Sequence, residues 1–222
     1  MILHLVTDRG RLIGRVPFQE ARRCLALQAQ HAIEARVDCI HIRERDLEAR
    51  DLAELAAEIV KLARGTRTRV VVNDRVDVAL AARADGVHLR ADSVPTGAVR
   101  RMTRRGFLIG RSVHTVEEAS VEMDADYLVA GTVWPSSSKP EGHTLLGLKG
   151  FASIVDAARV PVLAIGGVTL ERVADVAAAG GAGVAAIGLF LDETAQSGCR
   201  AMSQAKMADA MRRRFDTSGS GS

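Results

Sequence analysis

The sequence predicts a single closed (β/α)8 barrel of the TIM-barrel type, and three observations lead to this fold class. Eight short apolar runs alternate with longer segments of helical periodicity along most of the 222 residues. Strict alternation of this kind produces a parallel sheet covered by helices. The runs consist mainly of Val, Ile, Leu and Ala, as in strands that are buried on both faces. No G-x-G-x-x-G follows the first run, which argues against the alternative, a doubly wound open sheet.

Each expected element follows from a local pattern. The first strand is the apolar run Ile2–Val6, and the helix over residues 18–35 places Ala21, Cys24 and Ala32 at helical spacing, although Gln28 interrupts this stripe. The other strands are predicted at residues 38–42, 69–72, 86–89, 107–110, 127–130, 161–165 and 183–187. The other helices are predicted at residues 52–63, 76–82, 96–102, 116–123, 148–158, 170–179 and 203–214. We therefore expect one barrel domain over residues 1–214 and a flexible tail over residues 215–222.

Composition and charge narrow the function classes. Hydrophobic residues make up 47% of the chain, which excludes a disordered protein, and aromatic residues only 3%, which argues against a base-stacking binder of nucleic acid. The formal net charge of +3 suits an anionic small molecule and gives no reason to expect a nucleic-acid partner. Cys24, Cys39 and Cys199 have no paired spacing, so neither a disulfide framework nor a zinc site is expected. The N-terminus reaches the charged Asp8 too early for a signal peptide, and no apolar stretch suits a membrane span, so we expect a cytoplasmic protein.

Polar and glycine residues gather just after the apolar runs, where the carboxyl ends of barrel strands form the active site. Gly166 and Gly167 follow the seventh run, while Ile187 and Gly188 lie at the end of the eighth. Loops after strands seven and eight form the recurrent phosphate site of this fold, because glycine lets backbone N–H groups approach an anion. These four residues are therefore the predicted phosphate-binding residues, although a Gly-Gly pair is also typical of a simple tight turn.

The end of the second run carries His41, Arg43 and Arg45. The period of two along a strand sends these three side chains to one side. Three potentially cationic groups at this end of a strand suit a carboxylate or a phosphate. The alternative interpretation is a solvated loop in which they pair with Glu44 and Asp46.

Three further loops supply candidates. His114 follows the fifth run, just before a helix that Thr115 would cap with Glu118 as its partner, and a histidine there is suited to proton transfer. Asn73 and Asp74 follow the third run, and they are either magnesium ligands or a cap of the helix that begins near residue 76. The loop after the sixth run carries hydroxyls and an ammonium group that can hold an anion: Ser136, Ser137, Ser138 and Lys139. The remaining histidines are expected to be structural or exposed: His4, His31, His88 and His143.

Five segments, in this order and spacing, resemble the superfamily of thiamine phosphate synthases and TenI-type thiazole tautomerases. They are CIHIRERD, VVNDRVDVALAARADGVHL, LIGRSVHTVEEA, DYLVAGTVWPSSSKP and PVLAIGGVTLERVADVAAAG. The resemblance covers nearly the whole chain up to about residue 214. It implies a (β/α)8 barrel, a thiazole phosphate ligand, a role in thiamine biosynthesis and a homodimer.

The resemblance implies two activities on one fold, and the first is the synthase, which joins an aminopyrimidine methyl pyrophosphate to thiazole phosphate with Mg²⁺. Its pyrophosphate-binding pattern Gln-x-Arg-x-Lys matches the positions of His41, Arg43 and Arg45, so two of the three residues differ. Its magnesium ligands are two aspartates. The first matches Asp74, whereas Ser93 stands at the second position, with Asp92 one residue early. Its Thr-x-Thr-Lys loop appears as residues 136–139, which keep the hydroxyls and the lysine.

The second activity, the tautomerase, fits these signatures better, because its catalytic histidine falls on His114. We therefore expect an isomerase, a thiazole tautomerase that aromatises a carboxythiazole phosphate by a proton shift at His114 and needs no cofactor. The alternatives are the synthase, a transferase with Mg²⁺ at Asp74, and a non-catalytic protein that binds a thiamine metabolite. The residues expected to contact the substrate are His41, Arg43, Arg45, Asn73, Ser112, Ser136, Ser138 and Lys139.

Overall fold

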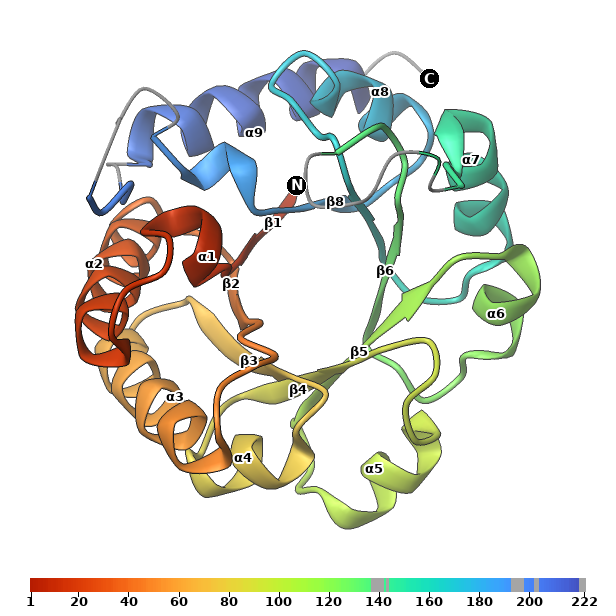
Figure 1. The fold of residues 1–222 in the computed structure, drawn as a ribbon. Helices are drawn as coiled ribbons and strands as arrows, with labels where there is room; N and C mark the ends of the chain where they lie inside the picture. Colours follow the sequence, from red (N-terminus) through yellow and green to blue (C-terminus); the bar gives the residue numbers. More distant parts are fainter. Residues whose placement is uncertain (137–141, 143, 193–197, 202–203, 220–222) are drawn as a thin grey trace.

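Eight parallel strands close into a barrel in the computed structural model, which describes residues 1–136, 142, 144–192, 198–201 and 204–219. Every strand pairs with its neighbours in chain order, and β1 closes the ring by pairing with β8 (Figure 1). This arrangement confirms the predicted single (β/α)8 barrel. The strands are β1 (Ile2–Val6), β2 (Cys39–Ile42), β3 (Arg69–Asn73), β4 (Gly86–Leu89), β5 (Leu108–Val113), β6 (Tyr127–Gly131), β7 (Val162–Ile165) and β8 (Gly183–Ala186).

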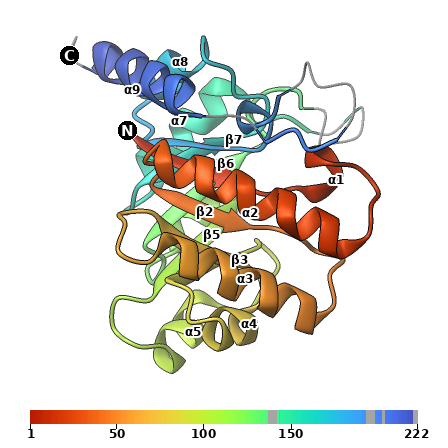
Figure 2. The same ribbon diagram turned by 90° about the vertical axis from the view of Figure 1, so that its left-hand side faces the viewer.

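Helices surround the barrel on its outside (Figures 1 and 2). They are α1 (Arg9–Leu12), α2 (Phe18–Glu34), α3 (Ala49–Ala63), α4 (Val76–Ala81), α5 (Thr96–Met102), α6 (Val116–Val121), α7 (Gly147–Ala157), α8 (Val173–Ala178), the 3-10 turn η1 (Gly188–Phe190) and α9 (Ala205–Gly219). The last helix runs past the expected boundary at residue 214, because Phe215 packs against the hydrophobic core and continues the apolar face of α9. Among the described residues, none of the helices combines the length and the apolar character that crossing a membrane requires.

The strands bury both of their faces in two different environments. Outward-facing residues such as Leu3, Ile40 and Val87 belong to the large core between the barrel and the helices. Inside the barrel lie a smaller apolar cluster and the buried side chains of three histidines, two of which contact Tyr127 of that cluster. The members of the inner cluster are Val6, Tyr127, Val129, Leu163 and Ala185, and the histidines are His4, His41 and His88. Strand residues of alternate parity therefore reach the barrel interior, which positions polar groups there for the site.

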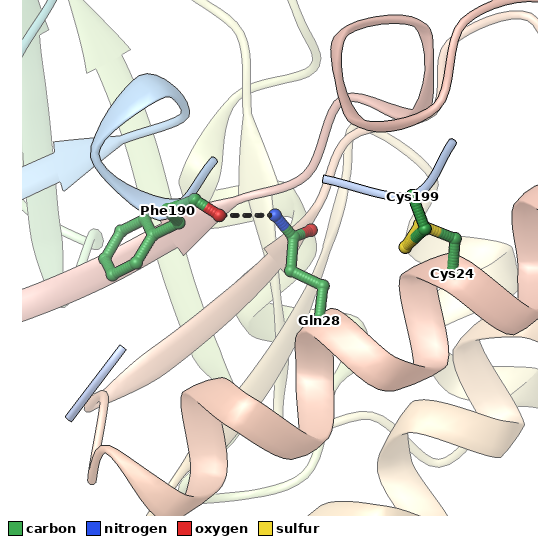
Figure 3. The surroundings of a disulfide bond; sticks show 4 residues. All are labelled: Cys24, Gln28, Phe190 and Cys199. Carbon is green, nitrogen blue, oxygen red and sulfur yellow. Dashed lines mark hydrogen bonds between the residues drawn. A yellow bond between two sulfur atoms is a disulfide. The ribbon is translucent and has the colours of Figure 1, made fainter. Parts of the chain in front are cut away.

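A disulfide corrects the expectation that the cysteines do not pair. Cys24 of α2 is bonded to Cys199, with 175 residues of sequence separation and 5.7 Å between the Cα atoms (Figure 3). Spacing along the chain gives no sign of this pair, because only the closed barrel brings the segment after β8 beside α2. Gln28, one turn further along α2, is buried and donates its Nε2 proton to the carbonyl of Phe190 at 3.3 Å. The polar interruption of the helix stripe therefore contacts the same neighbouring segment.

Candidate active site

Two adjoining pockets open at the carboxyl ends of the strands. The first, of about 560 Å³, is lined by all four predicted phosphate-binding residues, which are Gly166, Gly167, Ile187 and Gly188. The second, of about 410 Å³, is lined mainly by residues of β2 to β5 and the loops after them. Both pockets are lined by Ile165, Gly166 and Ile187, so they form one continuous cleft.

The first pocket, hereafter the glycine pocket, depends on two residues with backbone conformations that favour glycine. Gly166 and Gly167 have φ angles of +94° and +62°, and a Cβ at Gly166 would overlap the side chain of Thr132. Arg172, which sequence reasoning missed, donates from Nη1 to the carbonyl of Gly167 at 2.5 Å and lies over the ring of Trp134 at 5.3 Å. This arginine holds the loop in shape and adds positive charge to the pocket.

The loop after β6 is only partly described. Ser136 lines the glycine pocket. Two predicted substrate-binding residues, Ser138 and Lys139, lie outside the described residues, as does His143.

The second pocket, hereafter the arginine pocket, contains the predicted cluster at the end of β2. His41, Arg43 and Arg45 all line it. Burial, and then the neighbouring histidines, lower the pKa of His41 well below its ordinary value, so its ring is neutral at pH 7. Arginine stays protonated in proteins. The strand end therefore offers two cations rather than the three potential ones that the sequence suggested.

The expected alternative, pairing of these arginines with neighbouring carboxylates, is not what the structure has. Glu44 does not line the arginine pocket and is buried, where it accepts hydrogen bonds from the hydroxyl of Thr7 at 2.7 Å and from Arg9. Asp46 also binds Arg9. Across the described part of the chain, no ion pair joins the guanidinium groups of the two β2 arginines to a carboxylate, which leaves them available for an anionic ligand.

His114 lies exposed at the edge of the arginine pocket. Its Nδ1 donates to the carbonyl of Gly131 at 2.6 Å, so this nitrogen carries a proton and Nε2 is the ring nitrogen left for a ligand. The predicted helix cap is confirmed, because the hydroxyl of Thr115 accepts from the backbone N–H of Glu118 at 3.2 Å. The Glu118 carboxylate in turn accepts from the backbone N–H of His114 at 2.6 Å. These contacts fix where the histidine stands.

Buried histidines hold the polar floor of the arginine pocket. Nε2 of His41 lies 3.2 Å from Oδ1 of Asn73, and Nε2 of His88 lies 2.9 Å from Oγ of Ser112. The other ring nitrogen of His88 lies 3.2 Å from the hydroxyl of Tyr127. Two of the predicted substrate contacts, Asn73 and Ser112, are thus oriented from below. The expectation that His88 is structural or exposed overlooked its inward register on β4, which is the signal that could have placed it at the pocket.

The side chain of Asp74 faces the loop after β4. It accepts a hydrogen bond from the Ser93 hydroxyl, and one of its oxygens lies 3.7 Å from Nη1 of Arg90. Asp92 forms an ion pair with Nη2 of the same arginine. The alternative role of Asp74 as a helix cap is not observed, because α4 has Arg75 at its N-cap and no capping side chain.

These residues, as arranged, do not fit a magnesium ion held by two aspartates. Position 93 does lie beside Asp74, as the family pattern requires, but its serine brings no charge. The guanidinium of Arg90 lies where an ion bound to both Asp74 and Asp92 would have to lie. Mg²⁺ needs near-octahedral oxygen ligands at about 2.1 Å, and a neighbouring cation repels it. Within the described ranges there is also no cluster of three or more His, Cys, Asp or Glu suited to a metal ion.

The fold and the cleft define a (β/α)8-barrel protein with two pockets suited to anions. Within that class, the chain belongs to the thiamine monophosphate synthase family, whose family model matches residues 4–190. This confirms the superfamily to which the sequence motifs pointed.

Individual relatives agree. A thiamine-phosphate synthase of Roseiflexus sp. (strain RS-1) is 38% identical over 188 residues, which cover 84% of this chain and 76% of that protein. One of Methanospirillum hungatei JF-1 is 40% identical over 187 residues, which cover 83% and 87% of the two chains. The solved structure of a thiamine phosphate pyrophosphorylase from Pyrococcus furiosus superposes with a TM-score of 0.76 at 28% identity and covers 98% of this chain and 96% of that one.

These comparisons correct the expected activity. The relatives are named as synthases, so the prediction of a thiazole tautomerase is wrong. The catalytic role of His114 stays a prediction. That prediction gave weight to the substitutions at residues 41 and 45. At these two positions the charges of the synthase pattern are kept: neutral His41 stands where the pattern has neutral glutamine, and Arg45 keeps the cation of the pattern's lysine.

Proposed function

We propose that this chain is a thiamine-phosphate synthase, which joins an aminopyrimidine methyl pyrophosphate to thiazole phosphate. The observation that carries the proposal is the continuous cleft, because its two pockets suit two different phosphorylated substrates. The glycine pocket, with its backbone N–H groups, suits the monophosphate of the thiazole. The arginine pocket, with two guanidinium groups that pair with no described carboxylate, suits the more highly charged pyrophosphate.

The proposed reaction exchanges one bond for another. The bond between the pyrimidine methylene carbon and the pyrophosphate oxygen breaks, and its electron pair leaves with the pyrophosphate. The thiazole nitrogen then donates its lone pair to the resulting pyrimidine carbocation and forms the new C–N bond. Arg43 and Arg45 stabilise the charge that develops on the leaving pyrophosphate, which is electrostatic catalysis by donors already in place. Glycine-pocket contacts hold the thiazole so that its nitrogen faces the carbocation.

The test supplies purified protein with both substrates and measures thiamine phosphate by mass spectrometry and released pyrophosphate by a coupled assay. Reactions run in parallel with Mg²⁺ and with EDTA. We expect equal amounts of the two products. Replacement of the cation in Arg43→Gln should reduce the rate constant kcat/KM about ten- to a hundredfold, the loss typical of one charge-assisted hydrogen bond. The matched control is Arg50→Gln, which removes an exposed arginine of α3 that pairs with Glu54.

Two outcomes would count against the proposal. Absence of thiamine phosphate in both buffers, with binding of thiazole phosphate retained, would favour a non-catalytic protein that binds a thiamine metabolite. Equal rates for Arg43→Gln and Arg50→Gln would remove the arginine pocket from the reaction.

A further inference from the structure

We infer that Arg90 supplies the positive charge toward the pyrophosphate that the family pattern assigns to a metal ion held by two aspartates. The inference rests on the proposed function only for the identity of the ligand. It starts from the disagreement between the residues after β3 and β4 and the magnesium site that the family pattern implies.

The first step concerns charge. In the family pattern two aspartates create a doubly negative site that attracts a divalent cation. Here the hydroxyl of Ser93 accepts from the backbone N–H of Arg90 at 3.0 Å and donates to Asp74, so its proton and one of its two lone pairs are already used within the protein. Asp74 is therefore left with one negative charge, and the Arg90 guanidinium next to it is positive.

The second step concerns position. Arg90 lines the arginine pocket together with Arg43 and Arg45, and Asp92 is the one carboxylate among the described residues that line it. The Arg90 side chain is 46% exposed, so a ligand can reach it. Three guanidinium groups facing one pocket match the several anionic oxygens of a pyrophosphate, and each can donate two parallel hydrogen bonds.

The third step concerns rigidity. The loop that carries Arg90 and Asp92 is held by Arg111 of β5, which donates to the carbonyls of Ala91 and Val94 at 2.7 and 2.8 Å. Asp92 is itself exposed and binds Nη2 of the guanidinium. The loop therefore holds the backbone of Arg90 beside the pocket. Because its partner Asp92 is exposed, a bound pyrophosphate can replace that carboxylate as the partner of the guanidinium.

The test measures pyrophosphate binding by titration calorimetry, in EDTA and with Mg²⁺, without any turnover. Wild-type protein should bind pyrophosphate in EDTA, and Arg90→Gln should weaken this binding about ten- to a hundredfold. Arg75→Gln is the matched control, because Arg75 is a neighbouring exposed arginine that pairs with Asp77, and its affinity should match wild type. Circular dichroism spectra of all variants establish that each is folded.

A gain-of-function variant sharpens the test. Arg90→Gln combined with Ser93→Asp places a second carboxylate beside Asp74 and removes the competing cation, so its pyrophosphate binding should become dependent on Mg²⁺. The inference is overturned if wild-type protein binds pyrophosphate only with Mg²⁺, if it binds none in either buffer, or if Arg90→Gln binds as tightly as wild type in EDTA.

The assignment of Arg90 and the proposed function can be rejected independently of each other. Arg90-dependent pyrophosphate binding without any thiamine phosphate formation would reject the proposed function and keep the assignment of Arg90. Formation of thiamine phosphate, together with pyrophosphate binding that is unchanged in Arg90→Gln, would support the proposed function and reject the assignment of Arg90.

Discussion

At the scale of single residues, the site is defined by which ionisable side chains stay charged. Burial lowers the pKa of His41 and leaves its ring neutral, whereas the half-buried Arg43 keeps its charge even though burial lowers its pKa as well. Two side chains that look alike in the sequence, each basic and each at the end of β2, therefore have different roles. His41 orients Asn73, and Arg43 faces the pocket as a cation.

His114 provides the residue-scale test of the corrected activity. The proposed reaction forms a C–N bond without removing a proton from carbon, so it needs no histidine base. His114→Asn should therefore keep thiamine phosphate formation within about tenfold of wild type, since loss of a general acid or base costs about a hundredfold or more. Steady-state kinetics beside Arg43→Gln provide the comparison. A loss of about a hundredfold or more in His114→Asn would mean that the histidine takes part in the chemistry.

At the scale of elements, the bounds of a strand can be predicted from its apolar pattern only where no polar site residue interrupts that pattern. The run predicted over residues 107–110 continues in the structure as β5 to Val113, because Ser112 pairs with Val129 and Val113 with Ala130 in the parallel register. Arg111 and Ser112 are polar, so the apolar run in the sequence ends before the strand does. Ser112 faces the arginine pocket, and Arg111 anchors the loop after β4.

Some site residues could be predicted from the sequence and others could not, depending on whether they directly follow an apolar run. The phosphate glycines and the cluster at the end of β2 follow apolar runs directly, so strand ends could be placed from the pattern alone. Arg172 and Arg90 act through contacts with other loops, such as the Gly167 carbonyl or Asp74, and such contacts exist only once the barrel has closed. Short elements such as α1 and η1 carry too few residues for a helical period to appear.

The barrel interior predicts a pH dependence of stability. Burial lowers the pKa of His4 to about 3 and, with the charge of neighbouring groups, that of His88 to about 3 as well, against about 6.5 in an unfolded chain. Above pH 6.5 the two histidines are neutral in both the folded and the unfolded chain. Below it only the unfolded chain binds protons, so the free energy of unfolding should fall as the pH drops from about 6.5 towards 3, by about 1.4 kcal/mol per pH unit for each histidine.

Denaturant titrations at several pH values, with a matched pair of variants, measure this dependence. His4→Leu should reduce the slope by the share of one histidine, and it removes an Nδ1 atom that has no hydrogen-bond partner among the described residues. Leu163 lies in the apolar cluster inside the barrel, and Leu163→Ala should lower stability at every pH without changing the slope. An unchanged slope in His4→Leu would contradict the assigned cause.

At the scale of the whole molecule, closure brings together parts of the chain that are far apart in sequence. β1 pairs with β8, and α9 packs beside α8, so the N-terminal and C-terminal parts of the chain form neighbouring sectors of one ring (Figures 1 and 2). The Cys24–Cys199 disulfide and the Gln28–Phe190 hydrogen bond join α2 to the segment that follows β8 (Figure 3). That segment begins with Ile187 and Gly188, so the same junction borders the glycine pocket.

The disulfide should therefore stabilise the closed barrel as a whole. Because it joins residues 175 positions apart, it removes many conformations from the unfolded chain, and Cys199→Ser should lower the free energy of unfolding by about 2–4 kcal/mol. Thermal unfolding followed by circular dichroism, with and without a dithiol reductant, measures this effect. The reductant should lower the Tm of the wild-type protein to that of Cys199→Ser and leave the variant unchanged. If the reductant shifts neither protein, the cross-link does not contribute to stability, and closure rests on the β1–β8 pairing and the helix packing alone.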